Sequence, residues 1–286
     1  MNPLVQPFYD PASSTVSYVV HAGPGSACAV IDPVLDFDLR AGRRTSVQAE
    51  RILAFIAEQR LVPAWLLETH VHADHLTAAP FLKARIGGRI AIGAGVVAVQ
   101  RVFGALFNAG SEFASDGREF DHLFVDDEAF AVGDIAVCVL ATPGHTPDGV
   151  TYLIGDAAFV GDTMFMPDGG TARCDFPGGD PRQLYGSLRR ILALPSATRI
   201  FVCHDYQPGG RPPAWQSSVA EQREGNIHVK DGVDEAAFVA LRSARDAKLP
   251  PPALLLPAVQ VNMRAGALPP PEANGVSYLK IPIDRW

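Results

Sequence analysis

Histidine and aspartate side chains recur in this sequence where segments with β-strand composition give way to loops. The four motifs are THVHADH at residues 69–75, TPGHT at 142–146, GDT at 161–163 and CHDY at 203–206. In the first motif, His70, His72, Asp74 and His75 fall within six residues. One regular helix or strand cannot point all four of these side chains inward. The series therefore predicts an irregular loop that wraps around a buried transition metal.

The ligand types limit the choice of metal without deciding it. Neutral imidazole and carboxylate suit Zn, Fe, Mn or Co, because imidazole favours later first-row metals and carboxylate favours harder ones. An isolated histidine is more often a core or surface residue than a ligand. We therefore expect no metal at His21, His122 or His228.

The composition favours a globular chain with a short, unusual tail. With 286 residues, 48% of them hydrophobic, the chain can form one large domain or one domain with an appendage. Proline runs at residues 250–252 and 269–271 mark the appendage. Because proline disfavours regular elements, we expect the tail beyond about residue 247 to wrap the surface in extended form, with an edge strand at residues 278–283.

The charge distribution argues against nucleic acid and membrane partners. The formal net charge is -7, and no cluster of Lys or Arg forms a basic footprint. No apolar run reaches the roughly 20 residues that a membrane span requires, and the first residues lack the pattern of a signal peptide. We expect a soluble, cytoplasmic protein.

The cysteines are typical of a reducing compartment. Cys28, Cys138, Cys174 and Cys203 are widely spaced and form no C-x-x-C pair, so reduced thiols are expected. Cys174 follows Arg173, which leaves two alternatives: a thiol of lowered pKa that accepts sulfur, or a cysteine that only packs.

Local patterns place the motifs on secondary structure. Strands are expected at residues 17–20, 28–31, 64–67, 135–141, 151–154, 157–160 and 200–203. Helices are expected at residues 45–60, 77–86 and 180–192, from Ser218 onward, and at residues 234–246. Each metal-binding motif then follows the carboxyl end of a strand, the usual location of sites in layered α/β folds. We infer a mixed-sheet protein with helices outside two packed sheets.

The order of these motifs resembles the metallo-β-lactamase superfamily over residues 16 to about 206. This resemblance implies an α/β fold of the αββα four-layer sandwich type, with a catalytic domain at residues 1–247 and an extension at residues 248–286 that wraps the same domain. Residues 31–36, Glu68, TARCDF at 171–176 and HDY at 204–206 are similar to the glutathione-dependent persulfide dioxygenases. QVN at 260–262 and KIPI at 280–283 resemble their bacterial stand-alone branch, which carries no rhodanese-like segment.

The resemblance implies a metal, a substrate and a ligand set. One Fe(II) would be held by His70, His145 and Asp162, and positions would stay open for sulfur and O₂, as in other two-His-one-carboxylate sites. The substrate would be glutathione persulfide, oxidised with O₂ to sulfite and glutathione in sulfide oxidation. With one iron, the side chains left over would orient the ligands by hydrogen bonding. These are His72, Asp74, His75 and His204.

Two other functions stay open at this point. Superfamily hydrolases hold two zinc ions, one on His70, His72 and His145 and the other on Asp74, His75 and His204, with Asp162 bridging, and all seven residues are present. A glyoxalase-II-like hydrolase of glutathione thioesters is therefore the alternative, although residues 147–149 lack the second histidine common in such enzymes. A non-catalytic sulfur or metal sensor is the third possibility.

Several residues are candidates for substrate contacts. The hydroxyl of Tyr206 would donate toward substrate or bound oxygen, or the ring only packs. Arg173 would bind a carboxylate of glutathione or form a structural pair with Asp175 or Asp205, and we favour the pair. Arg223 is the other candidate for that carboxylate, with an exposed helix charge as the alternative. Association as a homodimer is a mild expectation.

Overall fold

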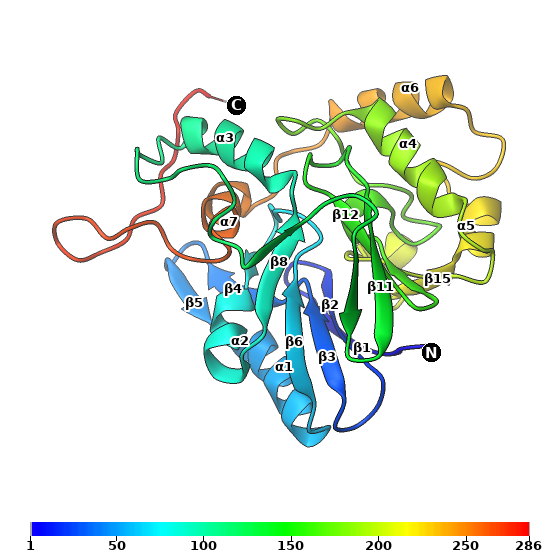
Figure 1. The fold of residues 1–286 in the computed structure, drawn as a ribbon. Helices are drawn as coiled ribbons and strands as arrows, with labels where there is room; N and C mark the ends of the chain where they lie inside the picture. The colour runs from blue at the N-terminus through cyan, green and yellow to red at the C-terminus, as the bar shows by residue number, and fades with distance from the viewer. Residues whose placement is uncertain (1, 286) are drawn as a thin grey trace.

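Two six-stranded sheets face each other in the computed structural model, which describes residues 2–285 (Figure 1). The first sheet has, in spatial order, β1 (Leu4–Asp10), β2 (Thr15–His21), β3 (Ala27–Ile31), β6 (Val62–Leu67), β8 (Arg89–Gly93) and β9 (His122–Phe124). The second has β10 (Ala129–Val132), β11 (Ile135–Ala141), β12 (Val150–Ile154), β13 (Ala157–Phe159), β14 (Arg199–Phe201) and β15 (Gln216–Ser218). A small third sheet joins β5 (Arg43–Thr45), β4 (Val34–Asp38) and β7 (Leu76–Thr77).

Helices cover the outer face of each large sheet. The first sheet is covered by α1 (Val47–Glu58), α2 (Ala79–Ile86), α3 (Val96–Leu106) and α7 (Leu255–Asn262). The second is covered by α4 (Pro181–Leu192), α5 (Val219–Gly225) and α6 (Glu235–Asp246), at the right of Figure 1. Two short 3-10 helices, η1 (Gly161–Thr163) and η2 (Pro208–Gly210), lie in loops.

Alternation along the strands produces the layers. In the first sheet, Val19 and Leu66 pack against the helices, whereas Val20 and Leu67 face the second sheet. This two-residue period places one apolar cluster between the sheets and another under each helical layer. The predicted αββα four-layer sandwich is therefore confirmed.

Most predicted elements lie where the local signals put them. β2 and β3 pair antiparallel, and β12 and β13 form the hairpin around residues 155–156. Asp180 caps α4 by accepting from the amides of Arg182 and Gln183. Ser218 and Asp234 cap α5 and α6 in the same way. The side-chain caps thus fixed these helix starts.

The two other helix starts were predicted wrongly. α1 begins after Ser46, which makes no side-chain capping bond, because Thr45 is the last residue of β5. α2 begins after Ala78, since Thr77 lies in β7 opposite Val34. Local sequence predicts Thr45 and Thr77 as the N-cap residues of these helices. In the structure both threonines pair with β4 in the small sheet instead.

The prediction for the tail was wrong in two places. Residues 255–262 form the helix α7, and the residues described at 278–283 form no strand. Leu255, Ala258 and Val261 of α7 are buried in the cluster under the first sheet's helices. Pro257 is tolerated because it lies in the first turn, where its missing amide hydrogen would have no partner in the helix. Burial of an apolar face outweighs the proline content of the segment.

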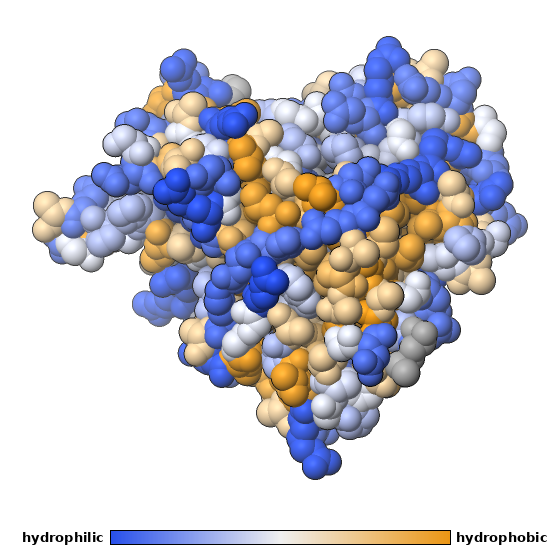
Figure 2. All heavy atoms as spheres, viewed as in Figure 1, coloured by the Kyte–Doolittle hydropathy of each residue, from blue (hydrophilic) through white to orange (hydrophobic). Residues whose placement is uncertain are grey.

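On the face shown in Figure 2, hydrophobic residues gather in the middle, where a band of hydrophilic residues crosses them, and hydrophilic residues cover most of the edge. Within residues 2–285, no helix is both long and apolar enough to cross a membrane. All four cysteines are free, as predicted.

Candidate metal centre

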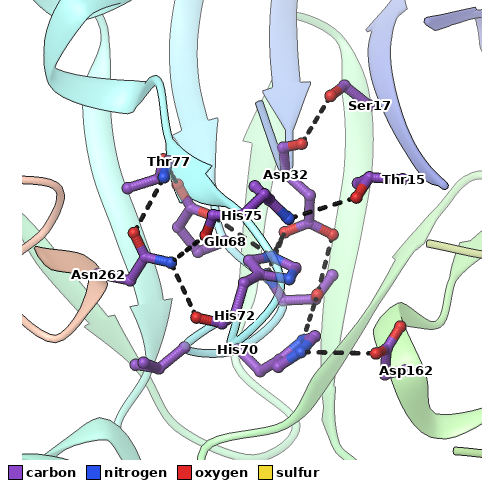
Figure 3. Close-up of polar contacts among 12 residues, drawn as sticks. Thr15, Ser17, Asp32, Glu68, His70, His72, His75, Thr77, Asp162 and Asn262 are labelled. Carbon is purple, nitrogen blue, oxygen red and sulfur yellow. Dashed lines mark hydrogen bonds and ion pairs between the residues drawn. The ribbon is translucent and has the colours of Figure 1, made fainter. Parts of the chain in front are cut away.

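The four motifs meet at one edge of the sandwich. The first follows β6 of the first sheet, and the other three follow β11, β13 and β14 of the second sheet. The loops that carry them therefore converge from both sheets, and Figure 3 shows this for His70, which follows β6, and Asp162, which follows β13. Because irregular backbone is needed to aim several side chains at one point, the site lies in the loops and not within the strands.

His70, His145 and Asp162 come together as a compact group of ligand atoms. Asp162 Oδ2 lies 3.9 Å from His70 Nε2 and 3.7 Å from His145 Nε2. All three residues are buried, and their ligand atoms lie within 4.8 Å of one another. Two imidazole nitrogens and one carboxylate oxygen that face a common point are the donor set of a transition-metal site.

The remaining ring nitrogens of both histidines are held by oxygen atoms. His145 Nδ1 donates to the carbonyl of Arg173 at 2.6 Å. Thr69 Oγ1 donates to Asp32 at 2.9 Å, so it accepts from His70 Nδ1 at 3.0 Å. With hydrogen on Nδ1, each neutral ring has its Nε2 lone pair free for the metal. Burial and the neighbouring His72 hold the pKa of His70 well below its ordinary value, which favours this neutral form.

Asp162 is held through its other oxygen. His204 Nδ1 lies 2.5 Å from Asp162 Oδ1, which leaves Oδ2 to face the two histidines. Burial alone would raise the pKa of Asp162, but His204, His70 and His145 outweigh it and lower that pKa. The carboxylate is therefore ionised and oriented at neutral pH, as a metal ligand must be.

The four other candidates form a second, hydrogen-bonded layer. Asp74 Oδ2 contacts His204 Nε2 at 2.7 Å and His75 Nδ1 at 3.0 Å. His72 Nε2 lies 2.9 Å from Asp32 Oδ1. His72, Asp74 and His75 form a separate group of potential ligand atoms. Two nitrogens in it, His72 Nδ1 and His75 Nε2, are buried and have no hydrogen-bond partner among the described residues.

Two residues to which the sequence assigned no role support this site. Asp32 accepts from the amide of Thr69 at 2.7 Å and also contacts His72. Asn262, from α7, donates to the carbonyls of His72 and His75 at 2.9 and 2.8 Å and accepts from the amide of Thr77 at 2.9 Å (Figure 3). The loop at residues 69–75, here called the metal loop, is thus held by hydrogen bonds to Asp32 on one side and from Asn262 on the other. The only sequence signal was their position in motifs of the resembled family.

A cavity of about 490 Å³, here called the metal-site cavity, opens next to these ligands and is lined by His145 and Asp162. Tyr206 also lines it, with its side chain 59% exposed and its ring stacked on His204 at a centroid distance of 5.7 Å. Within the described part of the chain, the Tyr206 hydroxyl has no hydrogen-bond partner. A free phenol facing the cavity is available to a ligand.

The candidate arginines are engaged in ion pairs. Arg173 lines the metal-site cavity and forms a two-pronged pair with Asp175 at 2.7 and 2.8 Å, which is the structural pair we favoured. Asp205 is paired instead with Arg211. Arg223 pairs with Asp231 and does not line the metal-site cavity.

Cys174 does not have the lowered pKa that we considered. Its side chain is buried, and its sulfur lies 3.4 Å from Asp246 Oδ2. Burial and the Asp246 carboxylate raise the pKa of Cys174 to about 12. The residue is therefore a neutral thiol at physiological pH and not a reactive thiolate.

Comparison with known proteins agrees with this architecture. The family model described as "Metallo-beta-lactamase superfamily" matches residues 10–204. The chain is 54% identical to a probable metallo-hydrolase of Burkholderia pseudomallei, over 98% of this chain and 99% of that protein. It is 46% identical to glyoxylase B2 of Dictyostelium discoideum, over 98% and 97% of the two chains. It is 29% identical to the mitochondrial persulfide dioxygenase ETHE1 of Bos taurus, over 94% and 91%.

Among solved structures, ETHE1 from Myxococcus xanthus superposes with a TM-score of 0.73. The alignment covers 92% of this chain and 100% of that one, at 30% sequence identity. The sandwich, the converging loops and the matched region all support the same family assignment. This chain belongs to the metallo-β-lactamase superfamily and carries its metal-binding His/Asp site.

Proposed function

We propose that this protein is a non-heme Fe(II) dioxygenase that converts glutathione persulfide, O₂ and water to glutathione and sulfite. One iron per chain would be held by His70, His145 and Asp162. The 29% identity to the persulfide dioxygenase of Bos taurus and the fold shared with ETHE1 of Myxococcus xanthus support this assignment. The observation that carries it is the hydrogen bond between His204 and the second oxygen of Asp162.

That hydrogen bond favours one metal over two. His204 Nδ1 engages Asp162 Oδ1, and only Oδ2 faces His70 and His145, so His204 in this arrangement supports the carboxylate of the three-residue group and is not directed at a second metal. His204 and Asp74, which a second metal would need, hydrogen-bond each other at 2.7 Å. A lone two-His-one-carboxylate set leaves neighbouring coordination positions open, as oxygenases require.

The chain itself would bind, orient and shield the reactants. Ferrous iron at this site would supply the redox chemistry by which a persulfide reacts with O₂. Phe165 and Phe176 line the metal-site cavity and would limit the access of water to it, and the free hydroxyl of Tyr206 would donate a hydrogen bond to the substrate. The hydrogen bonds that His145 and His70 donate to the oxygens of Arg173 and Thr69 would keep both imidazoles in place through turnover.

The test combines metal analysis with oxygen consumption. Protein purified under reducing conditions should contain about one iron per chain and should consume O₂ when glutathione persulfide is added. One sulfite should form for each O₂ consumed, and none without O₂. D162N should abolish turnover, whereas H122A, which removes a surface histidine paired with Glu128, should not. Two zinc ions per chain and no oxygen uptake would refute the proposal.

One observation favours a second candidate, a glyoxalase-II-like, zinc-dependent hydrolase of glutathione thioesters. The unpartnered His72 Nδ1 and His75 Nε2 are potential ligand atoms beyond the first three, and the chain is 46% identical to glyoxylase B2. This activity would require His204 to release Asp162. Hydrolysis of a glutathione thioester by the two-zinc protein, with no oxygen uptake by the iron-loaded protein, would select it.

A further inference from the structure

Three arginines line the metal-site cavity together with the metal ligands. They are Arg173 in the loop after η1 and Arg242 and Arg245 in α6. A cavity that ends in a metal-binding group and also contains several cations is suited to a ligand with a soft or anionic head and a separate carboxylate. Which of the three cations is free to bind such a carboxylate depends on their existing partners.

Two of the three are already neutralised. Arg173 pairs with Asp175, and its Nη1 donates to the carbonyl of Pro250 at 2.7 Å. Arg242 is buried, pairs with Asp246 and donates to the carbonyl of Thr171 at 2.7 Å. Rotating either guanidinium toward a ligand would leave a carboxylate without its partner, which is costly for the buried Asp246.

Arg245 is different. It is exposed, it lies three residues beyond Arg242 in α6, and its side chain has no hydrogen bond or ion pair within residues 2–285. Its side chain lines the metal-site cavity, which also contains His145 and Asp162. Arg245 therefore contributes a positive charge to the cavity that no side chain of the described protein compensates.

We propose that Arg245 is a substrate-binding residue that pairs with a carboxylate of glutathione while the sulfur end of the ligand lies at His145 and Asp162. This inference rests on the proposed function only in taking a glutathione conjugate as the ligand. A guanidinium with no competing partner can form two parallel hydrogen bonds to a carboxylate. The adjacent wall at residues 250–252 consists of three consecutive prolines, whose restricted backbone is suited to cover the peptide between the two ends.

The same geometry gives Arg173 a positioning role. Its backbone carbonyl holds His145, and its guanidinium fastens the carbonyls of Leu249 and Pro250 beside the cavity. Arg173 thereby links a metal ligand to the wall at residues 250–252, and Arg245 is left to select the substrate. Persulfides or thioesters with a carboxylate would be preferred over those without one.

The subsite can be tested by binding, without turnover. Zinc-loaded, oxygen-free wild type, R245A, R245K and R182A would be titrated with S-methylglutathione and with its dimethyl ester. We expect R245A to weaken S-methylglutathione binding about tenfold or more, the scale of a charge-assisted pair, and R245K to restore part of it. R182A removes an exposed arginine that pairs with Glu235 outside the cavity and should bind like wild type. The dimethyl ester should bind wild type and R245A equally.

Kinetics provide the second readout. With glutathione persulfide, R245A should raise KM and leave kcat nearly unchanged, and with hydroxyethyl persulfide both constants should match wild type. Equal binding of S-methylglutathione to wild type and R245A, or no binding to either, would overturn the subsite. A wild type that binds S-methylglutathione through Arg245 but consumes no O₂ would instead refute the dioxygenase and leave the subsite standing.

Discussion

Single buried residues in this protein have protonation states set by their surroundings, and His228 is an example outside the metal site. It is 3% exposed, and its Nδ1 accepts from the amide of Thr171 at 2.9 Å. Burial, followed by the charges of Arg242 and Arg245, lowers the pKa of His228 to about 4. The folded protein therefore keeps this imidazole neutral at pH values where the unfolded chain protonates it.

The sign of the resulting pH dependence follows from linkage. Between about pH 6.5 and 4 the unfolded state binds a proton at His228 that the folded state does not. The stabilisation is complete above pH 6.5 and is lost as the pH falls through that window, by at most about 1.4 kcal/mol per pH unit. H228N keeps an acceptor near the position of Nδ1 but does not titrate.

Urea unfolding at several pH values between 7.5 and 4 would measure this effect. The free energy of unfolding of H228N should decline less steeply than that of wild type below pH 6.5. Other groups titrate equally in both proteins, so the difference isolates His228. Parallel curves for the two proteins would show that His228 binds its proton equally in the folded and unfolded states, which would contradict the lowered pKa.

At the scale of elements, α7 holds the backbone of the metal loop through hydrogen bonds from Asn262, an interaction here called the Asn262 clamp. Asn262 is 4% exposed and contacts three backbone groups, the carbonyls of His72 and His75 in that loop and the amide of Thr77 in β7, which follows it. The loop has no regular hydrogen-bond ladder of its own, so these bonds stand in for one. The tail helix therefore has a direct effect on the geometry of the metal ligands.

Asn262 offers an isosteric test of this clamp. N262D keeps the acceptor for Thr77 but replaces the donor to His72 and His75 with an oxygen that faces two carbonyls. We expect a loss of about 2 to 4 kcal/mol in the free energy of unfolding and weaker metal binding. Urea unfolding and metal titration would check both effects. N274D, in an exposed loop, is the control, and equal behaviour of the two variants would rule out the clamp.

The same elements show what the sequence could and could not predict. Asp180 and the turn at residues 155–156 act locally, so α4 and the β12–β13 hairpin were predictable. The contact from Asn262 to His72 spans 190 positions, and α7 is stabilised by burial against distant elements. Neither leaves a local pattern. The candidate ligands could be predicted because loops that follow strands present their side chains together. The residues that support them, Asp32 and Asn262, could not be predicted in this way.

For the whole molecule, the metal site is a junction between the two sheets. His70 follows β6 of the first sheet, whereas His145 and Asp162 lie in loops of the second. A metal bound to all three would tie the sheets together at this edge, and the unfolded chain cannot offer the same arrangement. Metal binding therefore adds to the free energy of unfolding by mass action, about 2.7 kcal/mol when the free metal is at 100 times Kd.

Metal removal should accordingly lower the stability of the entire sandwich and not only of the loops. Protein treated with a chelator should unfold at a lower urea concentration than the metal-loaded protein, and the difference should grow with the free metal concentration. D162N retains an oxygen for His204 but loses the charged ligand, so its midpoint should barely respond to the chelator. If the chelator lowers the unfolding midpoint of wild type and of D162N by the same amount, the metal is bound elsewhere. If neither responds, the three ligands do not hold a metal that links the sheets.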